Sequence, residues 1–384
     1  MSRRSLALAS CLVASIVVVG CQEPTAAPVT PSAPQLATAR SSGPALARGW
    51  PSRSLTLPSS LPSVDRVFAE TGPRAIDPDD YVCSNVSQIN GYLNAELNNT
   101  LKVEPTIFWT MYDRYADYLP TYDALYFQTS ATPQTFGYSG QFTQVMVKTE
   151  RDVKAFWDIP SQNIQVVGMH GTMLADAERT YRTYKLFGFR DKVATEYAAA
   201  VRDALLKSTT MNGGNYAFWT FNAVSFRATG VGNKIAMGDG ILEGYAALGF
   251  GDVAPQAIFA HEYAHQIQYE HNYFADVANL DGPEQTRYTE LMADAMSAYF
   301  LTHARGAAMN QKRVEQFLSV FYQIGDCAFT NDGHHGTPNQ RMAAAQLGFT
   351  IADQYQVQGQ ILTSQQFHDL FVQAYPSIIA PDAT

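Results

Sequence analysis

Two histidines flank a glutamate in the segment His261-Glu262-Tyr263-Ala264-His265. Residues four apart in a helix lie on the same face one turn from each other, so two imidazole nitrogens can bind one Zn²⁺. A glutamate between them lies beside the metal, where it can take a proton from a water that zinc activates. The pattern predicts a zinc site with His261 and His265 as ligands and Glu262 as general base.

Glu290 follows His265 by 25 residues and lies on the next predicted helix, one turn before Asp294. Catalytic zinc uses three protein ligands, and a carboxylate from a neighbouring antiparallel helix supplies the third. Asp294 shares the face of Glu290 and can accept the second ring N–H of a ligand histidine. The alternative is a solvated acidic face. Apolar residues fill this helix, however, and buried carboxylates require a partner.

The combination of His261–His265 with Glu290-x-x-Ala293-Asp294 resembles the H-E-x-x-H and E-x-x-A-D pattern of gluzincin metallopeptidases. That group includes bacterial neutral zinc metallopeptidases and membrane-embedded prenyl-protein peptidases. The resemblance covers roughly residues 234–345 and implies a zincin-like domain, a zinc cofactor, peptide substrates and a substrate strand above the active helix. The sequence lacks the several membrane spans of the membrane-embedded group, which favours the periplasmic members.

The segment from Gly333 to Arg341, with sequence GHHGTPNQR, is similar to the H-G-x-x-x-Q-R or H-P-x-x-x-R segment that follows the zinc site in those groups. The similarity suggests that a histidine or arginine here donates to the oxyanion of the tetrahedral intermediate, and His335 is the first candidate. The alternative is a capped helix start, because Thr337 and Gln340 have the spacing of a capping box and Arg341 can pair with an acid.

The residues just before the active helix, Ala236, Met237 and Gly238, could form the substrate-lining edge strand that the resemblance implies. Their position in the chain suits the gluzincin order. The alternative is that the glycines of this segment only permit a turn or mark a bulge.

The sequence also predicts the helices that must position these groups. One helix is predicted from Pro255 to about His271 with Asp252 as its cap, and a second from near Pro283 to about Ala304. The same periodicity predicts helices over Lys192–Leu206 and Lys312–Ile324, and strands over Gln141–Lys148, Ile164–Met169 and Tyr216–Arg227.

The first 21 residues have the layout of a secretory signal, with Arg3 and Arg4 followed by an apolar run. Val18-Val19-Gly20-Cys21 resembles the lipobox of bacterial lipoproteins, which implies lipidation at Cys21 and a membrane anchor at the cell envelope. The alternative is an uncleaved N-terminal anchor. Residues 22–64 hold eight of the nineteen prolines and few large apolar groups, so they are expected to form an unfolded tether.

Two cysteines, Cys83 and Cys327, remain after the leader. In an oxidising compartment such a pair indicates one disulfide, which would tie the start of the globular part to a loop beside the proposed site. The alternative is two unpaired buried thiols.

The composition fits a globular enzyme. In 384 residues, 46% hydrophobic and 12% aromatic side chains can form one large core or two smaller ones. We expect an α+β fold with a small mixed sheet, an α/β region over 65–230 and a mainly helical zinc-binding region over 231–384. The formal charge of −9 argues against a nucleic-acid partner.

The leading hypothesis is therefore a zinc-dependent endopeptidase. The first alternative is a lipid-anchored binding or scaffold protein that keeps the fold without turnover, and the second is a zinc hydrolase that acts on a non-protein amide. An intact Glu262 counts against the scaffold, because a protein without turnover has no need of the base.

Overall fold

The fold was analysed in a computed structural model. It describes residues 13–15, 83, 87–228, 230–327, 329, 333–355 and 359–382. The predicted lipidation site at Cys21 and the tether over residues 22–64 lie outside the described residues. Within them, no helix combines the length and the apolar character required to cross a bilayer.

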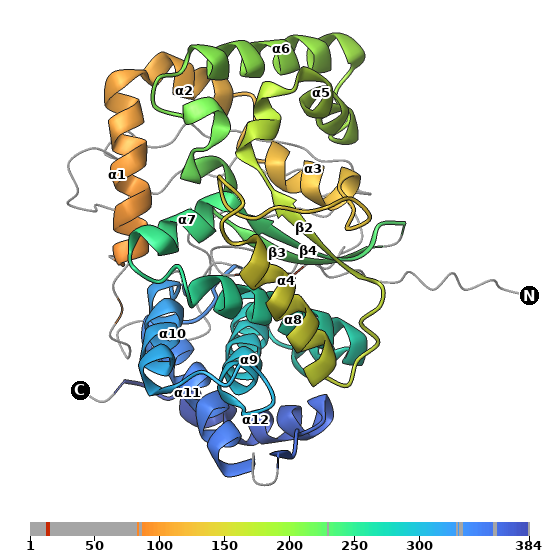
Figure 1. The fold of residues 1–384 in the computed structure, drawn as a ribbon, viewed down its shortest axis with the longest axis vertical. Coiled ribbons are helices and arrows are strands. Elements are labelled where there is room, and N and C mark those ends of the chain that lie inside the picture. Colours follow the sequence, from red (N-terminus) through yellow and green to blue (C-terminus); the bar gives the residue numbers. More distant parts are fainter. Residues whose placement is uncertain are drawn as a thin grey trace, which may run out of the picture.

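A small mixed sheet lies at the centre of the molecule (Figure 1). Its strands are β2 (Ile164–Met169), β3 (Ala223–Ala228) and β4 (Gly232–Gly238), and β1 (Val13–Ser15) pairs with the outer edge of β3. Strand β4 runs parallel to β2 and antiparallel to β3. The α+β class predicted from the sequence is thus present, with helices as the larger part.

Strand β4 occupies an interior position, which corrects the prediction of a substrate-lining edge strand. Ala236 pairs with Val167 on one side and with Val224 on the other, and Met237 and Gly238 are also paired with β2. The backbone of β4 is paired with β2 along one edge and with β3 along the other, so no extended peptide can add to it. The predicted boundary at residue 230 also falls inside the β3–β4 hairpin, so the regions before and after it share one sheet.

Helices from the first half of the described chain and α7 lie above and beside the sheet in Figure 1. Short 3-10 turns connect several of them, and α3 packs against β2 and β4. These helices are α1 (Gln88–Val103), α2 (Pro105–Tyr112), α3 (Leu119–Phe127), α5 (Ala177–Leu186), α6 (Asp191–Lys207) and α7 (Asp239–Ala247).

The opposite side of the sheet is covered by a second group of helices (Figure 1). The helices predicted over residues 255–271, 283–304 and 312–324 are present to within about two residues, whereas residues 141–148 were predicted to form a strand and instead contain the start of α4. The helices are α4 (Thr143–Phe156), α8 (Ala254–His271), α9 (Gly282–Thr302), α10 (Gln311–Gln323), α11 (Pro338–Tyr355) and α12 (Ser364–Ile378). In α4 the buried side chains recur at helical spacing, and its first residue follows the turn at Gly140.

Helix α8 is fixed directly beneath the sheet. The side-chain amide of Gln266 donates to the Ser225 hydroxyl on β3 at 2.6 Å and to the Lys234 carbonyl on β4 at 3.2 Å. Pro255 lies in its first turn, as predicted, but the capping residue is Val253 and no side chain caps the helix, so the prediction for Asp252 was wrong. The sheet therefore sets the position of the helix that carries His261 and His265.

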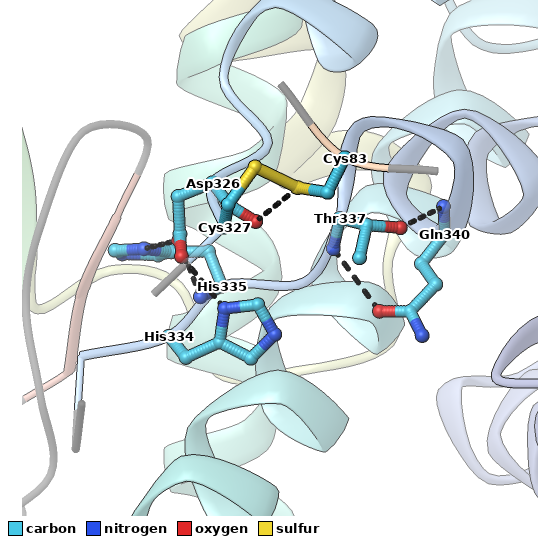
Figure 2. Close-up of a disulfide and its surroundings, with 7 residues drawn as sticks. All are labelled: Cys83, Asp326, Cys327, His334, His335, Thr337 and Gln340. Atoms are coloured by element: carbon cyan, nitrogen blue, oxygen red, sulfur yellow. Dashed lines mark hydrogen bonds and ion pairs between the residues drawn. A yellow bond between two sulfur atoms is a disulfide. The ribbon is translucent and has the colours of Figure 1, made fainter. Parts of the chain in front are cut away.

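A disulfide joins Cys83 to Cys327, as the cysteine count indicated (Figure 2). The side-chain oxygen of Gln323 adds to this connection by accepting hydrogen bonds from the Gln88 and Ile89 amides at the start of α1. The bond thereby links the beginning of the folded region to the segment between α10 and α11, 244 residues later.

Removal of this disulfide in a Cys83→Ser/Cys327→Ser double variant should lower the free energy of unfolding by about 2–5 kcal/mol, because the unfolded chain regains the freedom of a very long loop. Urea unfolding followed by circular dichroism measures the change. Parent protein treated with reductant should behave like the variant, and an unchanged midpoint in both samples would contradict a stabilising role for the bond.

Candidate metal centre

The site lies where α8 and α9 pack antiparallel to each other. His265 on α8 faces Glu290 on α9, and one turn earlier on α8, His261 faces Asp294, one turn later on α9. All four side chains are fully buried. Residues four apart in a helix lie on one face, so His261 and His265 share a face of α8, and Glu290 and Asp294 share a face of α9. Antiparallel packing brings the two faces together.

Three ligand atoms converge on one point. The Nε2 atoms of His261 and His265 are 3.1 Å apart, and the Glu290 carboxylate oxygens lie 3.2 Å from the first and 3.4 Å from the second. Ligands of a tetrahedral Zn²⁺ with bonds of about 2.0–2.1 Å are separated by about 3.3 Å. The three residues predicted as ligands therefore form a group that could hold a metal ion.

The outer nitrogens of both histidines are committed to hydrogen bonds. Nδ1 of His261 lies 2.7 Å from the Asp294 carboxylate, its ion-pair partner, and Nδ1 of His265 donates to the side-chain oxygen of Gln268 at 2.8 Å. Since each ring carries its proton on Nδ1, each Nε2 presents a lone pair to the shared point. Two lone pairs and the carboxylate of Glu290 then meet at hydrogen-bond distance, an arrangement that requires positive charge between them.

The buried charges lead to the same conclusion. Glu262, Glu290, Asp294 and Arg341 are all fully buried around the two histidines. With the carboxylates ionised, three negative charges and one positive charge leave two negative charges, which one divalent cation balances. Uncompensated buried charge is costly, so the donor set fits a divalent metal such as Zn²⁺.

The pKa shifts of the three proposed ligands reflect the negative charge and the burial of the site. Burial by itself lowers the pKa of His261, but its hydrogen bond to Asp294 and the charges of Asp294 and Glu290 raise that pKa above its ordinary value. Burial keeps the pKa of His265 below its ordinary value. Burial raises the pKa of Glu290, yet the charges of protonated His265 and His335, and the hydrogen bonds that protonated His261 and His265 donate, hold it well below its usual range. Positive charge between the three side chains, from protons or from a metal ion, therefore favours the ionised form of Glu290.

Arg341 supports the site from the first turns of α11. Its Nε and one terminal nitrogen each donate to the Asp294 carboxylate at 2.7 Å, forming a buried two-pronged pair. The Thr337 hydroxyl accepts from the Gln340 amide, and the Gln340 side chain accepts from the Thr337 amide (Figure 2). Both parts of the structural alternative for this segment, the capping box and the arginine pair, are therefore present.

His334 and His335 precede that helix and share one acid, Asp326 (Figure 2). Nδ1 of His334 lies 2.6 Å from Asp326, whose other oxygen accepts from the His335 amide at 2.9 Å and lies 3.2 Å from its Nδ1. Burial raises the pKa of Asp326, but the two histidines hold it well below its ordinary value.

Two residues of the site were missed by the sequence analysis. Gln268 orients His265, and Asp326 orients the histidine pair. The position of Gln268, three residues after a ligand histidine on the same helix, was a signal that could have been read. Asp326 carried no such signal beyond being next to Cys327, because its segment and that of its partners are joined by tertiary structure, including a hydrogen bond from the Asp326 amide to the Gly336 carbonyl.

Comparison of the sequence with protein-family models, with curated proteins and with solved structures gives no match. Among the residues that the structure describes, His261, His265 and Glu290 form a buried group that could hold a metal ion.

The full-length chain should contain about one zinc ion when analysed for metals after purification, and a Glu290→Ala variant should lose most of it, because two histidines alone do not complete a catalytic zinc site. Glu178→Ala, at an exposed position on α5, is the matched control and should keep the metal. Equal metal content in the two variants would contradict the assignment of Glu290.

An Arg341→Met variant should be less stable than the parent by about 3–5 kcal/mol, because Asp294 is left buried without its cation. Lys148→Met removes one of the two cationic partners of Asp152, at a site where the lysine side chain is 59% exposed, and should cost no more than about 1 kcal/mol. Denaturant unfolding of both variants provides the comparison, and similar small losses would show that the buried pair is not stabilising.

Proposed function

We propose that this chain is a zinc-dependent peptidase with a zincin-like catalytic domain of the gluzincin type. The observation that carries the proposal is the convergence of three buried acceptors on one point, with a glutamate between the two histidines on the same helix. The order of the motifs and their placement on two antiparallel helices support the gluzincin assignment. The substrate class is peptides or proteins.

In this proposal, His261, His265 and Glu290 hold the metal. When bound, Zn²⁺ supplies Lewis-acid polarisation of a carbonyl group and acidification of a water molecule. Glu262 lies one residue after the first ligand and accepts a proton from the attacking water, then returns it to the leaving amine.

His335 is the proposed donor to the oxyanion. Its ring is held by Asp326 through Nδ1 at 3.2 Å, and in the protonated ring Nε2 carries a donor proton as well. Asp294 and Arg341 take no part in proton transfer and instead hold His261 in the required tautomer.

The location of the enzyme is part of the same proposal. The signal-like first 21 residues and the lipobox-like Cys21 support export and a lipid anchor at the bacterial cell envelope, with residues 22–64 as the tether. A disulfide between Cys83 and Cys327 agrees with an oxidising compartment.

A Glu262→Gln variant should lose about 10²–10⁴-fold in the rate of peptide hydrolysis, because the amide cannot accept the proton, while its zinc content stays near that of the parent. A quenched-fluorescence peptide library measures the rate, and elemental analysis measures the metal. Glu270→Gln, near the end of the same helix and partly exposed, is the control and should keep the parent rate.

The outcomes separate the alternatives. If the parent binds zinc and hydrolyses non-peptide amides but none of the peptides, the chain is a zinc hydrolase that acts on non-protein amides. Zinc binding without turnover on either panel would leave the scaffold hypothesis, and the role proposed for Glu262 would be wrong.

A further inference from the structure

The two proposed ligand histidines have chemically unlike partners. His261 donates to Asp294, a carboxylate that also accepts two hydrogen bonds from Arg341. His265 donates to Gln268, a neutral amide, at 2.8 Å. One histidine is therefore backed by a buried ion pair and the other by an uncharged side chain.

Gln268 is held so that only its oxygen can face His265. Its side-chain nitrogen donates to the backbone carbonyl of Thr289 at 2.7 Å, and the side chain is fully buried. A flipped amide would direct the NH₂ group at the ring proton and the oxygen at another carbonyl, losing both bonds. The orientation of Gln268 thus fixes the proton of His265 on Nδ1 and its lone pair on Nε2.

The same side chain also reaches the third proposed ligand. Thr289 directly precedes Glu290, so Gln268 joins the ring of His265 on α8 to the backbone beside Glu290 on α9. Its two bonds set the spacing of two ligands that come from different helices.

We propose that Gln268 is the positioning residue of the metal centre: it fixes the tautomer of His265 and holds His265 in register with Glu290. This inference rests on the metal site in the proposed function and concerns metal affinity, whether or not the chain hydrolyses peptides.

The test is zinc affinity of the full-length chain, measured by competition with a chromogenic chelator, in parent and Gln268→Met. Methionine keeps the volume of the side chain and removes both hydrogen bonds. Loss of an orienting partner of a metal-bound histidine weakens metal affinity by about 10–100-fold, and we expect that loss here. The Co²⁺-substituted protein should show altered visible absorption bands as well, because the ring of His265 is no longer held in place.

Gln266→Met is the matched control. Gln266 is on the same helix, is equally buried and donates to the sheet instead of to the site. The control should lower the melting temperature of the protein and leave its zinc affinity within about threefold of the parent, a range small beside the loss expected at Gln268.

Gln268→Glu separates the two bonds. The glutamate keeps an acceptor for His265 and, when ionised, lacks the donor for Thr289, so zinc affinity should recover at least about tenfold over the methionine variant through the first bond alone. Failure of this rescue would overturn the tautomer part of the proposal.

Parent-like affinity in Gln268→Met, or an equal loss in Gln266→Met, would overturn the proposal and leave the metal site intact. A folded parent that binds neither Zn²⁺ nor Co²⁺ would instead overturn the proposed function, and the positioning role with it.

Discussion

Three hydrogen-bond acceptors cannot share one buried point unless positive charge lies between them. His261, His265 and Glu290 are in that position, because the outer nitrogens of both rings are already donating and the carboxylate is held ionised. The cost of this arrangement in a water-free interior is high, and a divalent cation removes it. Much of the surrounding structure can be understood as the framework that keeps these three groups from moving apart.

Two contacts of that framework act on the ligands directly: the Arg341 pair holds Asp294 and with it the ring of His261, and Gln268 joins α8 to α9. Gln266 lies outside the site and joins α8 to the sheet. The segment between α10 and α11 is fixed separately, by the disulfide at Cys327 and by hydrogen bonds at Asp326. Each contact comes from a different part of the chain, so the site depends on the packing of the whole helical half and its sheet.

Sequence patterns were most informative where the periodicity was long and uniform. The bounds of α8, α9 and α10 agree with the prediction to within about two residues, as expected for strongly periodic helices. The segment that forms α4 was misread because a short stretch of alternating residues also satisfies a strand pattern. Asp252 has the residue type and spacing of a helix cap. The helix nevertheless begins at Ala254, directly after Val253, and no side chain caps it.

The sequence by itself determined which residues could bind a metal, because their types and their spacing of four along a helix are local properties. It also indicated the disulfide, since Cys83 and Cys327 were the two cysteines outside the leader. Tertiary structure alone decided that β4 is interior, that Gln268 and Asp326 orient histidines, and that Arg341 pairs with Asp294. These depend on contacts between segments distant in the chain, and helical or strand periodicity carries no information about which faces will meet.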